Sequence, residues 1–91
     1  MNSIVISYDV AKDGGESSIY QQLYAAIRAY GTWAHIMDSC WAIKTEHSTV
    51  EVRDALLGLL RPQDRLIVVQ TAHIAAWKNV MCSNDWLKEN I

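Results

Sequence analysis

The sequence contains no phenylalanine, and only one proline and four glycines among its 91 residues. Because disordered and collagen-like chains are rich in proline and glycine, this scarcity excludes both classes. No apolar run approaches the roughly 20 residues that a helix needs to cross a bilayer, so we expect no membrane contact of that kind. Basic residues are scattered and the net charge is −2 at pH 7, so the chain as a whole does not attract nucleic acid.

Cysteine is scarce as well, because the chain has only Cys40 and Cys82. Neither lies near a histidine or cysteine at the spacing of a zinc site. The N-terminus runs into a strand-like segment rather than a secretory signal, which predicts a cytoplasmic protein with reduced thiols. Four tryptophans are present, and large aromatic side chains are costly to expose. We therefore expect some of them to lie in an interface or a pocket.

Six segments of strand or helix pattern follow one another along the chain. Ser18 with Gln21, and Ser48 with Glu51, have the spacing of a helix capping box, and Pro62 ends the second helical pattern. Between the helices, the Asp38-Ser39 pair predicts a tight turn or a bulge between two short strands. The predicted strands lie near residues 3–9, 33–38, 40–46 and 65–70, and the predicted helices lie near 18–30 and 49–60.

This order of elements predicts an α+β fold. Each helix has a single apolar stripe, so both helices should cover one face of one antiparallel sheet, in the split β-α-β or ferredoxin-like arrangement. Residues 1–70 form this core, and residues 71–91 form a C-terminal extension without strong periodicity. The central strands are apolar on both sides, so we expect a second copy of the chain to cover the other face.

The candidate functional residues begin with Asp9, which ends the apolar run IVISYDV. It either accepts N–H bonds in the following loop or binds a metal ion. His35 is either a half-buried packing residue or an acid or base, and Ser39 has no visible base beside it. Trp77 and Trp86 are large apolar groups in a polar tail, which favours dimer anchors over core residues.

Several of these features resemble one family. They are the strand ending in Tyr8-Asp9, the capped helix ending at Gly31, the Ser39-Cys40-Trp41 segment, and a second helix running into Pro62-Gln63-Asp64. Over residues 4–70 the chain resembles the small CRISPR-associated endoribonuclease-like subunit of the spacer-acquisition complex. The same fold is found in VapD ribonuclease toxins and in proteins labelled SinR-like.

The resemblance implies a homodimer packed through its sheets, with C-terminal segments crossing onto the partner. It also implies that Asp9 and its symmetry mate hold Mg²⁺ or Mn²⁺ for phosphodiester hydrolysis of RNA or DNA. His35 and Met37 stand where family members commonly carry a basic residue and a glutamine. We therefore expect a dimeric scaffold that binds nucleic acid or a defence or toxin protein, in phage defence, with a metal-dependent endonuclease as the alternative.

Overall fold

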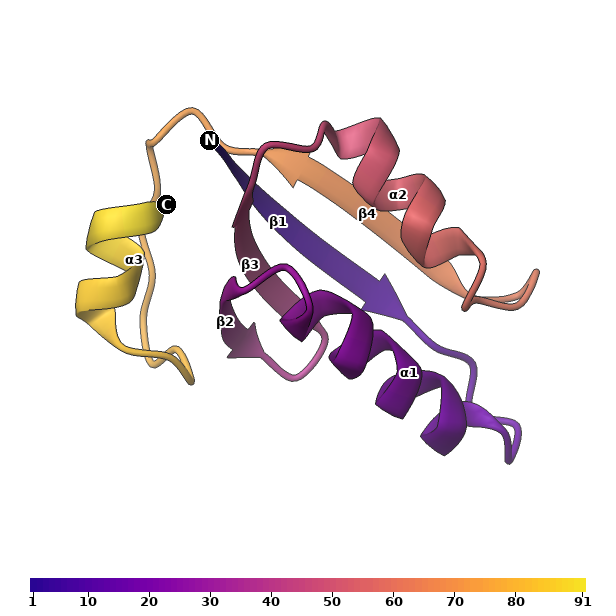
Figure 1. Cartoon of the computed structure of the whole chain (residues 1–91). Helices are drawn as coiled ribbons and strands as arrows, with labels where there is room; N and C mark the ends of the chain where they lie inside the picture. The colour runs from indigo at the N-terminus through magenta and orange to yellow at the C-terminus, as the bar shows by residue number, and fades with distance from the viewer.

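The computed structural model describes all 91 residues and contains one four-stranded antiparallel sheet and three helices (Figure 1). The strands lie in the order β2-β3-β1-β4, and the chain is therefore an α+β protein. The four strands and the first two helices confirm the elements expected from the sequence. The elements are β1 (Asn2–Asp9), α1 (Glu16–Arg28), β2 (Thr32–Met37), β3 (Cys40–Thr45), α2 (Thr49–Leu57), β4 (Arg65–Gln70) and α3 (Asn84–Asn90).

The main core lies between the sheet and the helices α1 and α2, which cover the same face as expected (Figure 1). Trp41 is fully buried there, and its indole Nε1 donates a hydrogen bond of 2.9 Å to the Tyr8 hydroxyl. Burial raises the pKa of Tyr8, so the phenol stays neutral. The other buried core residues are Ile4, Ile6, Val10, Leu23, Ile27, Ile43, Val52 and Leu56.

The two expected capping boxes have different outcomes. Ser48 caps α2, because its side chain accepts the Glu51 N–H while the Glu51 carboxylate accepts the Ser48 N–H. The predicted capping box at Ser18 is wrong. Helix α1 already begins at Glu16, and its N-cap residue is Gly15, which makes no side-chain capping hydrogen bond. The preceding loop explains the earlier start, since the Glu16 carboxylate accepts the Gly14 N–H at 2.8 Å.

The β2–β3 hairpin contains both the tight turn and the bulge that were considered for it. Asp38 and Ser39 form the turn, and the register shifts between His35 and Met37. Before β2, Gly31 has φ +88°, a left-handed conformation that a side chain disfavours. The sequence thus predicted this hairpin correctly.

Helix α3 is the one element that was not expected from the sequence. Ser83 caps it, and Leu87 is buried against Ile36 and Ala42 on the face of the sheet that α1 and α2 leave free. The expectation that a second copy covers this whole face is therefore wrong for its β2–β3 half, which the chain covers itself. None of the three helices is both long enough and apolar enough to cross a membrane.

Candidate functional site

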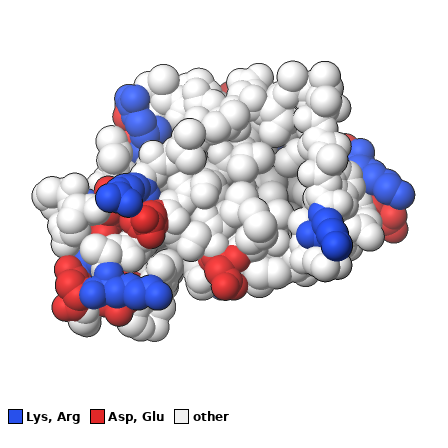
Figure 2. Space-filling model, turned by 180° about the vertical axis from the view of Figure 1, so that it is seen from behind, with Lys and Arg blue, Asp and Glu red and all other residues white.

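The face of the sheet opposite α1 and α2 has a second half, over β1 and β4, which no other element covers. Residues directly opposite one another in an antiparallel pair point to the same side of a sheet, so the register defines the members of this surface. We call it the open half-face, and it consists of Val5, Ser7, Asp9, Arg65, Ile67 and Val69. Ile67 is 60% exposed and Val69 is 46% exposed. Seen from behind in Figure 2, the centre of the molecule is uncharged and most charged side chains lie near its margins.

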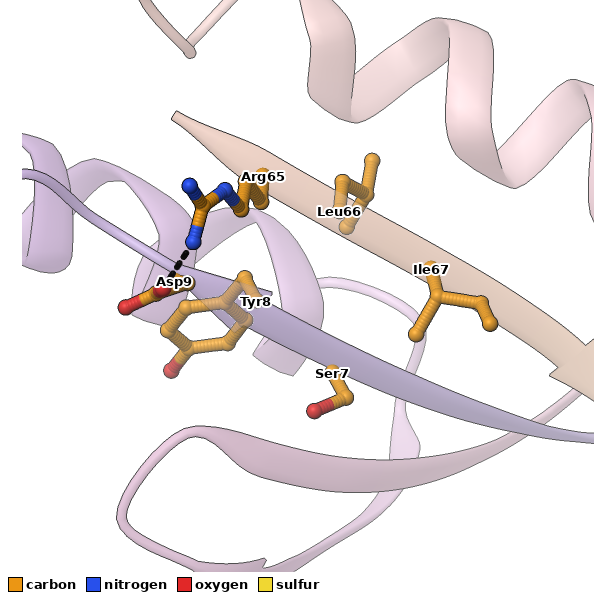
Figure 3. Close-up of a pocket in the computed structure, with 6 residues that line it drawn as sticks. All are labelled: Ser7, Tyr8, Asp9, Arg65, Leu66 and Ile67. Atoms are coloured by element: carbon orange, nitrogen blue, oxygen red, sulfur yellow. Dashed lines mark hydrogen bonds and ion pairs between the residues drawn. The ribbon is translucent and has the colours of Figure 1, made fainter. Parts of the chain in front are cut away.

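One end of the open half-face is hollowed into a shallow pocket of about 220 Å³. Its lining residues are Ser7, Tyr8, Asp9, Arg65, Leu66 and Ile67 (Figure 3). Asp9 and Arg65 lie opposite each other, and Arg65 Nη1 is 3.3 Å from Asp9 Oδ2. Their side chains are 73% and 82% exposed, so solvent screens the pair and its contribution to stability is about 0–1 kcal/mol.

Asp9 does not have the turn role considered for it. Its carboxylate accepts no N–H from the following loop. In that loop the Asp13 side chain accepts the Gly15 N–H, and the Glu16 side chain accepts the Gly14 N–H. The turn interpretation is therefore wrong. The chain also contains no group of three or more His, Cys, Asp or Glu residues that could hold a metal ion. One carboxylate beside the Arg65 cation does not fit a divalent cation, so a metal site needs the carboxylate of a second copy.

His35 lies on the opposite side of the sheet from Asp9. It is paired in register with Trp41, and the two rings stack with their centroids 4.0 Å apart and 8° between their planes. Its Nε2 donates to the Asp38 carbonyl at 3.1 Å, since a carbonyl oxygen can only accept. Asp9 and His35 therefore cannot act together on one bound substrate.

Ser39 lies in the β2–β3 turn, where its carbonyl accepts the Tyr8 N–H at 3.1 Å. Its hydroxyl makes no hydrogen bond within the chain, and no base is paired with it. The structure therefore brings the Ser39 backbone next to the end of β1, but it does not assemble Asp9, His35 and Ser39 into a catalytic set.

Sequence reasoning missed the aromatic cluster that surrounds His35. The Arg28 guanidinium at the end of α1 lies 5.5–5.7 Å from the ring centres of Tyr24, Trp33 and Trp41. Such cation–π contacts contribute about 0.5–1 kcal/mol each at exposed sites. The pairing of His35 with Trp41 follows from the β2–β3 register. The only sequence signal for this pairing was the predicted pair of strands joined at Asp38-Ser39.

Arg61 lies at the centre of a hydrogen-bond network that the scattered basic residues of the sequence did not indicate. It donates to the carboxylates of Asp13 and Asp64 and to the Ala11 carbonyl. The Asp64 side chain is fully shielded from solvent and also accepts the Ala11 N–H. The hydrogen bonds from Arg61 lower the pKa of Asp64 to about 2. This network joins the loop after β1 to the connection before β4.

Trp77 and Trp86 make contacts within their own chain. Both are half-buried against the small cluster of Ile36, Ala42 and Leu87, and the Trp77 indole donates to Asn84 Oδ1 at 3.0 Å. Their role as dimer anchors stays a prediction.

The chain matches no model of a known protein family and no curated protein.

Proposed function

We propose that the chain is a homodimeric binding protein in which two copies pack through their open half-faces. The observation that carries this proposal is the uncovered apolar surface of Val5 on β1 and of Ile67 and Val69 on the edge strand β4. Contiguous apolar surfaces of this kind favour a protein interface. A two-fold contact buries the same surface on both copies at once.

We also propose that the fold is the ferredoxin-like split β-α-β arrangement. It is supported by the order strand, helix, two strands, helix and strand, and by the strand order β2-β3-β1-β4. In this arrangement the two crossover helices lie on one face and leave the other face for association.

The charges at the rim suit self-association. Each copy contributes one Asp9 and one Arg65 at the same end of the open half-face, so two copies meet without a net excess of either sign. Trp77 and Trp86 pack on the same side of the sheet, over its β2–β3 half. We place them beside the interface, where a partner on the open half-face would reach the C-terminal segment.

A binding role fits this site better than catalysis does. Asp9 has an arginine beside it and no paired acid, base or nucleophile, whereas general acid–base chemistry needs such groups within hydrogen-bond reach. The net charge of −2 favours a protein partner, such as a defence or toxin protein, over RNA or DNA. The metal-dependent nuclease is the second candidate, because Asp9 is solvent-exposed and lies on the surface through which two copies would meet.

Analytical ultracentrifugation of Ser7→Arg tests the proposed dimer. Ser7 is half-buried within the open half-face, so a bulky cation there should separate the copies without disturbing the core. We expect wild type to sediment as a dimer at micromolar concentration and Ser7→Arg as a monomer. Ser17→Arg introduces the same side chain on the exposed surface of α1 and should remain dimeric. Equal masses for wild type and Ser7→Arg would contradict the proposal.

A further inference from the structure

Strand β4 lies at the edge of the sheet and is paired only with β1. The Thr71 N–H donates to the Ser3 carbonyl at 2.8 Å, which continues the β1–β4 register and makes Ser3 and Thr71 a hydrogen-bonded pair. Hydrogen-bonded and non-bonded pairs alternate along an antiparallel ladder, so Val69 and Ile67 also direct their backbone groups toward β1. The backbone groups that point away from β1 are therefore those of Leu66, Val68 and Gln70.

This edge lacks the features that usually protect an edge strand. Its residues 66–70 contain no charge and no proline, and its register with β1 has no bulge. The opposite edge, β2, has a bulge between His35 and Met37. There the C-terminal segment also covers the strand, because the Met81 N–H donates to the Ile36 carbonyl at 2.9 Å. Only β4 keeps an uninterrupted free edge.

Exposed apolar side chains lie on both sides of the β4 edge. On the helix side, Val50 and Leu57 of α2 are 52% and 50% exposed. A groove of about 230 Å³ runs between α2 and β4, and its lining includes Val50, Arg53 and Val68. On the other side lie the exposed side chains of Ile67 and Val69. An added strand would therefore meet apolar groups above and below the sheet.

We propose that the β4 edge pairs antiparallel with β4 of a second copy, about a two-fold axis at Val68. In an antiparallel pair, residues opposite each other point to the same face of the sheet, and an axis at Val68 satisfies this condition. The same axis lets the outward backbone groups of Leu66, Val68 and Gln70 form hydrogen bonds with those of the second copy. It places Ile67 opposite Val69 and Leu66 opposite Gln70. Arg65 falls outside the uncharged stretch, so no two charges face each other along it.

This contact lies at the sheet edge and is distinct from the open half-face, although its role in assembly rests on the proposed dimer. One short strand buries less surface than a sheet face, so edge pairing needs a higher protein concentration. Each chain then has two different two-fold contacts, and complexes larger than a dimer form.

Amide hydrogen exchange followed by NMR tests the edge contact directly. In dilute protein the outward amides should exchange rapidly, and concentrating the sample should slow them at least about tenfold as hydrogen bonds form. The amides of Ile67 and Val69 bond to β1 and should stay protected throughout. The amides to be followed are those of Leu66, Val68 and Gln70. Rapid exchange of these three at every concentration would overturn the proposal.

A proline variant gives a second test, carried out in the Ser7→Arg background so that only the edge can associate. Val68→Pro removes an outward N–H and leaves the hydrogen bonds to β1 in place. We expect Ser7→Arg to dimerise at millimolar concentration by light scattering, and Ser7→Arg with Val68→Pro to stay monomeric. The control Val68→Ala keeps the N–H and should still dimerise.

The outcomes separate the two proposals. Unchanged association in Val68→Pro overturns the edge contact alone, whereas unchanged association in Ser7→Arg at micromolar concentration overturns the open half-face dimer. If Val68→Pro lacks a cooperative unfolding transition, the exchange rates of the wild-type amides decide the question.

Discussion

Asp9 and Arg65 face each other across β1 and β4, and their side chains form an exposed ion pair of 3.3 Å at the end of the open half-face. A carboxylate at the end of an apolar strand usually suggests a turn or a metal ligand. Here its hydrogen-bond partner is a cation on the neighbouring strand. The pair therefore gives the rim of the proposed interface its balance of charge.

Asp9→Asn tests the shared metal site. If two copies hold a cation between their Asp9 side chains, the variant removes two negative charges per dimer and Mn²⁺ affinity should fall at least about tenfold. Its effect on stability should stay below about 1 kcal/mol, because the ion pair is exposed. Calorimetric titration of Mn²⁺ into both dimers measures the first effect, and urea denaturation measures the second.

Two further variants sharpen that titration. Arg65→Gln removes the competing cation and should strengthen Mn²⁺ binding if the site exists. Asp54→Asn alters another exposed carboxylate paired with an arginine, and it should leave binding unchanged. Equal, negligible binding by wild type and Asp9→Asn would exclude the metal site. Assays with single-stranded RNA and duplex DNA should then show no cleavage.

The Asp64 network predicts a loss of stability in acid. The folded-state pKa of about 2 lies below the usual value near 3.9, so the ionised form favours the folded state. This contribution is complete above about pH 4 and is lost as the pH falls toward 2. Urea denaturation should show wild type more stable than Asp64→Asn at pH 6, with the difference shrinking in acid. A difference independent of pH would contradict this account.

The two serines of the expected capping boxes form a matched pair. Ser48→Ala removes the N-cap of α2 and should lower the free energy of unfolding by about 1 kcal/mol. Ser18 lies inside α1, where its exposed hydroxyl only accepts from the Gln22 side chain at 3.3 Å. Ser18→Ala should therefore change stability by less than about 0.5 kcal/mol. Similar losses in both variants would refute the assignment of the helix starts.

Leu87→Ala tests the docking of α3 on the sheet. Leu87 is 2% exposed, so truncation should cost about 2–4 kcal/mol if α3 unfolds with the rest of the domain. If the C-terminal segment opens separately, amide exchange should speed up in residues 84–90 while β1 stays protected. No effect on either quantity would show that α3 is not held by this contact.

The sequence was sufficient for elements with a strong local signal. The apolar run of β1 and the Ser48–Glu51 box marked their elements because the cause lies within a few residues. Helix α3 has only Trp86 and Leu87 as apolar residues in its seven positions, which is too few for a helical period. Its docking depends on Ile36 and Ala42, which lie far away in sequence.

The candidate site was less predictable for the same reason. Asp9 was identified from its place at the strand end, but its pairing with Arg65 depends on the β1–β4 register across more than 50 positions. The Arg61 network likewise joins two loops that only the folded sheet brings together. His35 was identified as a strand residue, and only the hairpin register shows that it stacks on Trp41.

Isotope-filtered NMR detects the proposed contact between open half-faces directly. In a sample that mixes ¹³C-labelled and unlabelled chains at micromolar concentration, only contacts between copies give filtered NOEs. If two copies pack through this surface, the methyl groups of Val5, Ile67 and Val69 should give such NOEs, and Ser7→Arg should lose them. A dimer that shows filtered NOEs only from other residues, or a wild-type chain that shows none, would contradict the open half-face interface.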